Sequence, residues 1–426
     1  MDVQLPRGMR DFSPEEKLFR DKVLGTFKTV FERFGFNPLE TPVLERLDVL
    51  TSKFAGGEEI LKEMFTLTDQ GDRKLGLRYD MTVPLARYIG CNPNVKMPFK
   101  RYVIGPVYRD GPIKLGRYRE FYQCDADIVG TTSVAADAQC IELALAVFKE
   151  LGLDVRLVFN DRALLDSMLK KDGVAAEQLI PAILTLDKLK KIGEEGVRKE
   201  LTEKEIPTDA LDNVIRIAQL EPADRVQAIL KQYGPLPALA RVEGLRLKLQ
   251  ALYHGTTEKD RVLFDPSLAR GLTYYTGTVF EVFWNDERLT SSLLGAGRYD
   301  NMISEFLGKP APAVGISFGL EPIMEALKLQ GMEQRKTVTD VYVIPIKTPT
   351  EAARLVAQLR DAGVNADLDL TDKGISKNLQ YADALGIPYV VFLGKREIAD
   401  GVCKLKDMNS GEETLLTTEE LVARVT

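Results

Sequence analysis

The spacing of apolar and polar positions changes character several times along the chain. Ser13, Pro14 and Glu16 place a capping serine, a first-turn proline and an N3 glutamate in order, which predicts a helix running to Gly35. From about residue 36 to 130, short apolar or alternating runs are broken by Gly and Pro, a pattern typical of an antiparallel sheet with long hairpin loops. The run DAQCIELALAVFKELG then predicts a helix that covers this sheet.

The second half of the chain divides into a helical stretch, returning strands and a separate final unit. Residues from about 163 to 262 form a succession of helical patterns, which we interpret as a helical insertion. Strand patterns return in RGLTYYTGTVFEVFW and LTSSLLGAGRYD. From about 338 to 426, strands and helices alternate and predict a small, mostly parallel βαβ sheet, with Thr348 as N-cap of its first helix.

The amino-acid composition argues against several kinds of binding and catalytic site. The 426 residues carry 57 Lys and Arg against 63 Asp and Glu, a net charge of −6, so any nucleic-acid contact depends on local basic patches. The single histidine, His254, argues against a Ser-His-Asp relay or a multi-His metal site. Four scattered cysteines without a C-x-x-C pair, no signal-like segment and no long apolar run predict a cytoplasmic protein that does not span a membrane.

One strand of the predicted sheet has an unusually polar face. In REFYQCDADIVG, period-2 alternation puts four side chains on one face: Phe121, Gln123, Asp125 and Asp127. A buried apolar face does not normally carry two carboxylates and an amide, so this face is expected to line a polar pocket or solvent.

Three further segments could carry chemistry, each with a structural alternative. Residues 99 to 125 hold a cationic cluster that includes Arg109 and Arg117, suited to phosphate or simply to a solvated hairpin. Asp80 could hold a ligand ammonium or cap a turn. Arg270, followed by Tyr274 and Tyr275, could stabilise phosphate charge or belong to an aromatic core with a surface arginine.

Several ordered motifs together resemble the histidyl-tRNA synthetase family of class II aminoacyl-tRNA synthetases. They are LPRGMRDF, GFNPLETPVLE, LRYDMTVPLAR, VYRDGPIKLGRYREFYQCD, RGLTYYTGTVFE, GAGRYD and PAVGISFGLE, and the block GRYREFYQCD is similar to the archaeal or eukaryotic-like type. The resemblance implies an α+β fold: a six-stranded antiparallel catalytic sheet with flanking helices over 1–162 and 263–331, a helical insertion domain over 163–262, and an α/β anticodon-binding domain over 338–426.

The same resemblance implies substrates, partners and roles for single residues. ATP with Mg²⁺ would activate L-histidine to histidyl-adenylate, and a homodimer would transfer the histidyl group to tRNA(His). Arg109 and Arg270 would be catalytic. The remaining implied positions are Asp80, Thr82, Gln123, Asp127, Tyr274 and Tyr275 for histidine, Arg109, Asp110, Arg117, Gln123, Arg270 and Gly319 for ATP, and Pro42 for the dimer interface.

Two positions depart from the family pattern. Motif 3 normally ends in Gly-x-Glu-Arg, but here Pro322 stands in place of the arginine, and Arg298 or Arg117 could compensate. Motif 2 normally reads Arg-x-Glu, whereas here Asp110 directly follows Arg109. Two other functions therefore stay open, a histidine-binding regulatory paralogue of the ATP phosphoribosyltransferase type and a non-catalytic tRNA-sensing module. The C-terminal βαβ unit argues against the regulatory paralogue, which lacks an anticodon domain.

Overall fold

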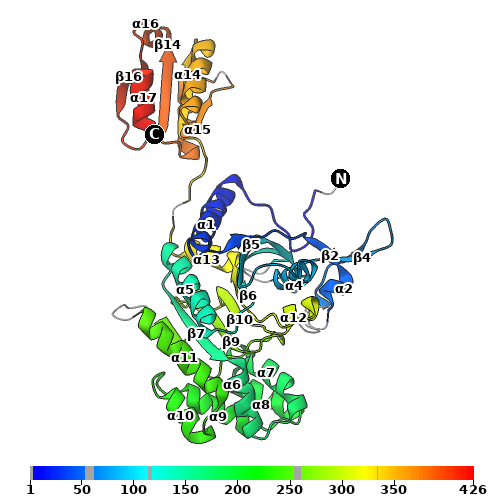
Figure 1. The fold of residues 1–426 in the computed structure, drawn as a ribbon. Helices are drawn as coiled ribbons and strands as arrows, with labels where there is room; N and C mark the ends of the chain where they lie inside the picture. Colours follow the sequence, from blue (N-terminus) through cyan, green and yellow to red (C-terminus); the bar gives the residue numbers. More distant parts are fainter. Residues whose placement is uncertain (1–2, 53–61, 114–117, 254–260, 333, 372) are drawn as a thin grey trace. The chain divides into compact units, whose positions relative to one another are not determined.

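A computed structural model describes residues 3–52, 62–113, 118–253, 261–332, 334–371 and 373–426 (Figure 1). The α-carbon contacts divide the chain into two units, one of residues 1–10 and 23–332, the other of residues 11–22 and 333–426. Each unit is described by itself. Within the described ranges, no helix is long and apolar enough to cross a membrane.

An eight-stranded sheet forms the centre of the first unit. Its strands, in spatial order, are β1 (Asn37–Pro38), β5 (Phe99–Tyr108), β6 (Glu120–Val129), β11 (Ala313–Gly319), β10 (Leu294–Arg298), β9 (Thr278–Trp284), β7 (Val155–Asp161) and β8 (Val262–Phe264). The six strands from β5 to β7 are all antiparallel to their neighbours, which confirms the predicted sheet. Two short parallel strands, β1 and β8, extend it at the edges.

Helices cover one face of this sheet with a mainly aromatic core. They are α1 (Pro14–Arg33), α5 (Val134–Glu150) and α13 (Leu320–Leu329). Phe318 of β11 lies at the centre of this layer, with ring centroids 4.9 Å from Phe27 of α1 and 5.5 Å from Phe148 of α5. Because side chains alternate along a strand, the residues on either side of Phe318 face the opposite surface, where the pocket described below lies.

The opposite side of the sheet carries smaller elements. Helix α4 (Thr82–Cys91) packs with α12 (Met302–Leu307), and both contribute to an apolar cluster with Tyr274, Tyr275 and Tyr299. Beside them lie α2 (Leu47–Leu50) and a three-stranded antiparallel sheet of β2 (Leu44–Arg46), β4 (Lys74–Leu77) and β3 (Thr66–Thr68).

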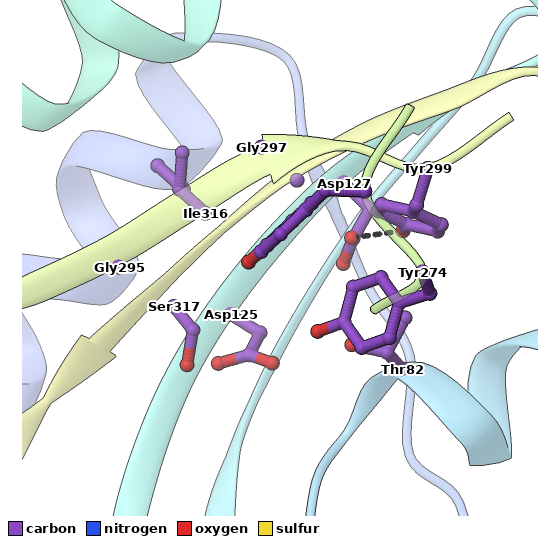
Figure 2. A pocket seen from close by; sticks show the side chains of 11 residues that line it. Thr82, Asp125, Asp127, Tyr274, Gly295, Gly297, Tyr299, Ile316 and Ser317 are labelled. Carbon is purple, nitrogen blue, oxygen red and sulfur yellow. Dashed lines mark hydrogen bonds between the residues drawn. The ribbon is translucent and has the colours of Figure 1, made fainter. Parts of the chain in front are cut away.

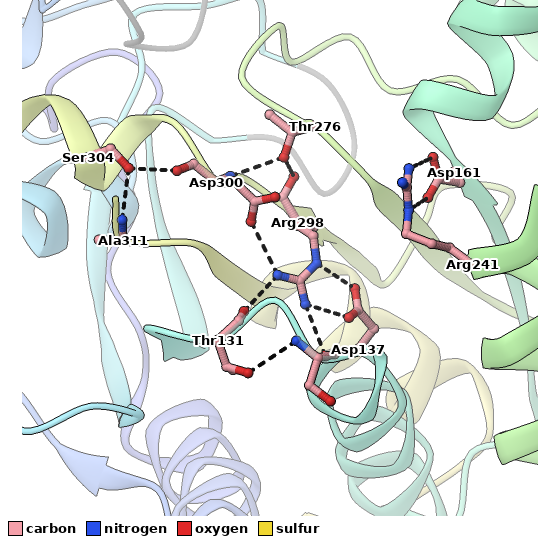
Figure 3. A network of polar contacts seen from close by, with 10 residues as sticks. Thr131, Asp137, Asp161, Arg241, Thr276, Arg298, Asp300, Ser304 and Ala311 are labelled. Carbon is pink, nitrogen blue, oxygen red and sulfur yellow. Dashed lines mark hydrogen bonds and ion pairs between the residues drawn. The ribbon is translucent and has the colours of Figure 1, made fainter. Parts of the chain in front are cut away.

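Helices follow one another from residue 162 to 252, as predicted for this stretch. They are α6 (Arg162–Lys171), a 3₁₀ turn η1 (Ala176–Gln178), α7 (Leu179–Leu186), α8 (Leu189–Glu203), α9 (Asp209–Ala218), α10 (Arg225–Tyr233) and α11 (Pro237–Leu252). The Arg241 guanidinium on α11 binds both oxygens of Asp161, at 2.9 and 3.0 Å, where β7 passes into α6 (Figure 3). This bidentate pair ties the helical stretch to the sheet.

The C-terminal unit is an α/β layer structure, as its pattern predicted, but its sheet is not mostly parallel, because the strands that follow its second parallel pairing return as antiparallel neighbours. A five-stranded sheet, in the order β13-β12-β14-β15-β16, combines parallel and antiparallel pairs. Its elements are β12 (Val341–Ile346), α14 (Pro349–Asp361), β13 (Ala366–Leu368), α15 (Ile375–Leu385), β14 (Tyr389–Gly394), α16 (Lys395–Ala399), β15 (Cys403–Asp407), β16 (Glu413–Leu416) and α17 (Thr418–Val425). Separate apolar clusters occupy the two faces of this sheet.

Two predicted helix starts have different outcomes. The capping box at α1 is confirmed, because the backbone N–H of Glu16 donates to Ser13 Oγ at 3.2 Å and Ser13 N–H donates to the Glu16 carboxylate. Thr348 does precede α14, but its hydroxyl donates to the Leu393 carbonyl instead of capping the helix. Its side chain therefore links α14 to β14.

A buried ion pair anchors α5 to the pocket-bearing strands. Arg298, at the end of β10, binds both oxygens of Asp137 in the first turn of α5 and donates to the carbonyls of Thr131 and Ser133 (Figure 3). Side-chain exposure is 7% for Arg298 and 1% for Asp137. Arg298 also pairs with the half-buried Asp300 at 3.2 Å, but only the Asp137 carboxylate binds it with both oxygens. Removing Asp137 would leave the buried guanidinium with this weaker partner, which costs more than losing a surface pair.

We expect Asp137→Ala to lower the free energy of unfolding by up to about 3 kcal/mol in denaturant titrations, because the buried Arg298 guanidinium keeps only Asp300 as an acidic partner. Asp286→Ala, which breaks an exposed pair with Arg288, is the matched control and should leave the unfolding midpoint nearly unchanged. Equal effects of the two substitutions would contradict the anchoring role of Asp137.

Candidate functional site

Two rows of cross-strand neighbours in the middle of the sheet form the floor of a polar pocket. The first row runs from Arg101 through Asp127 and Gly315 to Gly297. The second runs from Val103 through Asp125 and Ser317 to Gly295. The pocket residues, most of them drawn in Figure 2, are Thr82, Asp125, Asp127, Tyr274, Tyr275, Gly295, Gly297, Tyr299, Gly315, Ile316 and Ser317. Of the polar face predicted for residues 121–127, Asp125 and Asp127 line this pocket.

Three glycines give the charged and aromatic side chains room above the sheet. A methyl group at Gly315 would overlap Asp127 Oδ1, and one at Gly295 would overlap the Arg270 guanidinium. At Gly297, an added Cβ would come within 2.6 Å of the Tyr275 ring. Each of these glycines therefore leaves room for one charged or aromatic side chain.

Asp127 is the most tightly held carboxylate of the pocket. Arg101 Nη2 lies 2.7 Å from its Oδ2, and the Tyr299 hydroxyl donates to its Oδ1. Arg101 is itself only 1% exposed and also donates to the Met81 carbonyl at 3.0 Å. Burial raises the pKa of Asp127, whereas Arg101 and the tyrosine hydroxyl act to lower that pKa. These contacts fix the carboxylate in one orientation.

Asp125 lies two residues before Asp127 on the same face of β6, and the cost of burying its charge is less well offset by its neighbours. Burial raises the pKa of Asp125 to about 7, because neither the Arg101 charge nor the nearby Ser317 hydroxyl offsets desolvation and the repulsion by Asp127. Gln123, next on the same face, donates its side-chain N–H to Ser317 Oγ at 2.9 Å. The hydrogen bond between Gln123 and Ser317 thus links β6 to β11 next to the pocket.

Asp80 is placed by the beginning of α4. Its carboxylate accepts the backbone N–H of Val83 at 3.1 Å, so the capping role considered from the sequence is confirmed. Burial nevertheless raises the pKa of Asp80 to about 6, while Arg109 acts to lower that pKa. Arg109 donates to the Tyr79 carbonyl at 3.1 Å and lies over the Phe121 ring. Asp80, Arg109 and the pocket-lining Thr82 therefore belong to one neighbourhood.

Arg270, Tyr274 and Tyr275 lie in the segment before β9, and the two tyrosines share an apolar cluster with α4. Arg270 pairs with Glu281 of β9, and this carboxylate raises the pKa of Arg270 even though burial acts in the other direction. The two tyrosine rings have centroids 4.7 Å apart, and the Tyr274 ring also meets Tyr299 edge-on at 6.0 Å. Of the alternatives set out from the sequence, an exposed surface arginine does not describe Arg270.

Three other predicted site residues, all described, are not among the residues that line the pocket. Asp110 pairs with Arg119 at 2.7 Å, and Gly319 ends β11 with its N–H donated to the Leu293 carbonyl. Pro42 is exposed in the segment before β2. Arg117 and the lone histidine, His254, lie outside the described residues.

The proline in motif 3 fits the start of a helix. Pro322 occupies the first turn of α13, where no intrahelical N–H is required, and its ring packs close to Gly319. The neighbouring Glu321 accepts the Tyr122 backbone N–H at 3.1 Å. Arg298, suggested above as a compensating cation, is held by Asp137 as described.

Sequence reasoning missed four contributors to the pocket: Arg101, Tyr299, Ser317 and Gly315. Tyr299 directly follows a strand in GAGRYD, a place where a side chain can face a cleft. The others depend on strand register, since Arg101 and Gly315 flank Asp127 only after β5, β6 and β11 have paired. Within the described ranges, no group of three or more His, Cys, Asp or Glu side chains is arranged to hold a metal ion.

The raised pKa of Asp125 makes stability depend on pH. The unfolded chain loses this proton near pH 4 and the folded protein only near pH 7, so ionisation favours unfolding between these values. Relative to Asp125→Asn, wild-type protein should lose up to about 1.4 kcal/mol of unfolding free energy per pH unit in this window. Denaturant titrations at pH 5 and 7 measure this; Asp154→Asn, at an exposed carboxylate, should follow the wild type. A constant difference between wild type and Asp125→Asn would contradict the assignment.

Comparison with known proteins shows which family the chain resembles. A family model described as histidyl-tRNA synthetase matches residues 8–323, and one described as an anticodon binding domain matches residues 340–426. Histidine–tRNA ligase 1 of Bacillus anthracis is 41% identical over 99% of both chains. The histidine–tRNA ligase of Aeropyrum pernix is 37% identical over 99% of this chain and 97% of its own.

A solved structure agrees with the sequence relatives. The crystal structure of histidyl-tRNA synthetase from Nostoc sp. PCC 7120 superposes with a TM-score of 0.87 at 28% identity, covering 100% of this chain and 99% of its own. Fold, pocket-bearing motifs and full-length relatives therefore agree that this chain belongs to the histidyl-tRNA synthetase family.

Proposed function

We propose that this protein is a histidine–tRNA ligase, which activates L-histidine with ATP to histidyl-adenylate and transfers the histidyl group to the 3′ end of tRNA(His). The observation that carries the proposal is the polar pocket on the sheet, whose carboxylates and tyrosines complement an amino acid with an α-ammonium and a ring that carries an N–H donor. Full-length similarity to named histidine–tRNA ligases supports the same activity.

Recognition of the imidazole ring is assigned to the Asp127 end of the pocket. Asp127, oriented by Arg101 and Tyr299, accepts a ring N–H, while the hydroxyls of Tyr274 or Tyr275 complement the second ring nitrogen. An analogue without ring nitrogens would leave these buried partners unpaired, which is the basis of strong discrimination. Asp80, Thr82 and Gln123 are assigned to the amino-acid backbone.

Adenylation is assigned to two arginines. The carboxylate oxygen of histidine attacks the α-phosphorus of ATP, pyrophosphate leaves, and no side chain has to accept a proton. Arg109 and Arg270 would stabilise the negative charge that grows on the phosphate oxygens, with Glu281 keeping Arg270 ionised and in place. Alignment of carboxylate and phosphate accounts for the rest of the rate enhancement.

We propose the other ATP contacts on the basis of the family resemblance alone. Asp110, Arg117, Gln123 and Gly319 would contribute to nucleotide binding. The side chains described offer no three-ligand cluster, so Mg²⁺ would be held mainly by the phosphates, whose charge it neutralises.

The division into domains and the homodimer are also proposed from the family resemblance. Residues 1–162 with 263–331 would form the catalytic domain, 163–262 an insertion near the tRNA acceptor end, and 338–426 the anticodon-binding domain. A homodimer would form around the exposed Pro42. Four free cysteines support a reducing, cytoplasmic setting. The anticodon-domain match over residues 340–426 favours the ligase over a regulatory paralogue.

Histidine-dependent exchange of pyrophosphate into ATP tests the activity, and Arg270 tests its site. We expect Arg270→Ala to reduce exchange by roughly a hundredfold to a thousandfold, and also to destabilise the fold because Glu281 loses its partner. The double variant Arg270→Met with Glu281→Gln removes the stranded charge, so it should regain stability without regaining exchange. Recovery of exchange together with stability would show that Arg270 is only structural.

A truncation separates activation from tRNA charging. A protein ending at residue 331 lacks the C-terminal unit but keeps every pocket residue. We expect tRNA(His) charging to fall much more than histidine-dependent pyrophosphate exchange, because only charging needs the anticodon contact. Both are measured on the same purified preparation. A parallel loss in the two assays would contradict a separate tRNA-binding role for residues 338–426.

A further inference from the structure

Two buried acceptor atoms, one lining the pocket and one next to it, have no hydrogen-bond donor among the described residues. They are Asp125 Oδ1 and Gln123 Oε1, two residues apart on the same face of β6. Asp125 is only 3% exposed and lines the pocket (Figure 2). An unsatisfied buried acceptor is costly, so this part of the floor is suited to a ligand that brings hydrogen-bond donors.

Ser317 fixes how these acceptors are presented. Because the Gln123 amide N–H donates to Ser317 Oγ at 2.9 Å, the amide oxygen is left as the free end of this side chain. Ser317 is the cross-strand neighbour of Asp125, and its hydroxyl acts on the Asp125 carboxylate to lower its pKa. Ser317 of β11 therefore lies next to both side chains and fixes the orientation of the Gln123 amide.

The charges around Asp125 favour a cationic ligand. Arg101 of β5 acts on it, but this guanidinium is already 2.7 Å from the other carboxylate, Asp127. Asp127 on β6 and Asp80 before α4 both repel the ionised form of Asp125. Three carboxylates thus face this part of the pocket, and Arg101 directly pairs with one of them.

We propose that Asp125 binds the α-ammonium of the amino-acid substrate, as an acceptor additional to Asp80 and Gln123, and so selects ligands that carry this group. The inference rests on the proposed function of the same pocket. An ammonium has three N–H donors, and Asp80, Gln123 Oε1 and Asp125 supply three acceptors. A ligand that lacks the ammonium leaves Asp125 and Gln123 unpaired and is rejected.

Comparison of three ligands on wild type and Asp125→Asn tests this. L-Histidine and L-histidinol carry the ammonium, whereas 3-(imidazol-4-yl)propionate lacks it but keeps the ring and carboxylate. At pH 7.5, calorimetric titration should show Asp125→Asn losing roughly tenfold to a hundredfold in affinity for the first two ligands, with the propionate little changed. Asp161→Asn, which alters a buried carboxylate outside the pocket, should leave all three affinities unchanged.

A second variant and a pH series keep the test independent of folding. Ser317→Ala retains the charge but removes the hydroxyl between the two acceptors, so it should show a smaller loss with the same ligand selectivity. Because the pKa of Asp125 is about 7, the ratio of wild-type to Asp125→Asn affinity for histidine should rise between pH 6 and 8. Titration of the histidine ring affects both proteins and cancels in this ratio.

The outcomes separate the two hypotheses. If the wild-type protein does not bind L-histidine at all, the proposed function fails. If wild type binds histidine but Asp125→Asn is unchanged, or loses equal affinity for all three ligands, the ammonium role of Asp125 is overturned while the function stands.

Discussion

The structure depends on burying two carboxylates side by side on one face of β6. Asp125 and Asp127 are each 3% exposed, and one guanidinium, Arg101, is positioned against them. Such an arrangement destabilises the fold unless the surrounding atoms compensate for it. The surrounding groups offset only part of the cost of burying these two charges, since burial still raises the pKa of both carboxylates. A cationic substrate would complete it, so the site is prepared for binding at the expense of stability.

The rest of the sheet is arranged around this constraint. Across β10 and β11, glycines leave the space that Asp127, Arg270 and Tyr275 occupy. They are Gly315, Gly295 and Gly297. On the opposite face, Phe318 and its aromatic neighbours pack α1 and α5 against the strands. The same strands therefore combine a dense apolar side, which keeps them rigid, with an open polar side. That rigidity holds the carboxylates, Arg270 and the tyrosines at fixed positions.

Local patterns predicted the elements and the polar face, but the partners across strands required the structure. Alternation in residues 121–127 identified the face, and the Ser13 capping box identified the start of α1. The register that sets Arg101 against Asp127 and Ser317 against Asp125 depends on pairing between segments far apart in the chain. Thr348 and Arg298 show the same limit, because each side chain satisfies a distant group that spacing along the chain does not reveal.

The central claim is that the acidic floor recognises the two nitrogen-bearing ends of histidine separately. A crystal structure of the protein with L-histidine tests it most directly. We expect the α-ammonium to lie within hydrogen-bonding distance of Asp125 and Gln123. The imidazole ring should lie against Asp127, between the tyrosines. Histidine bound in the reverse orientation, or outside the pocket that these residues line, would contradict it.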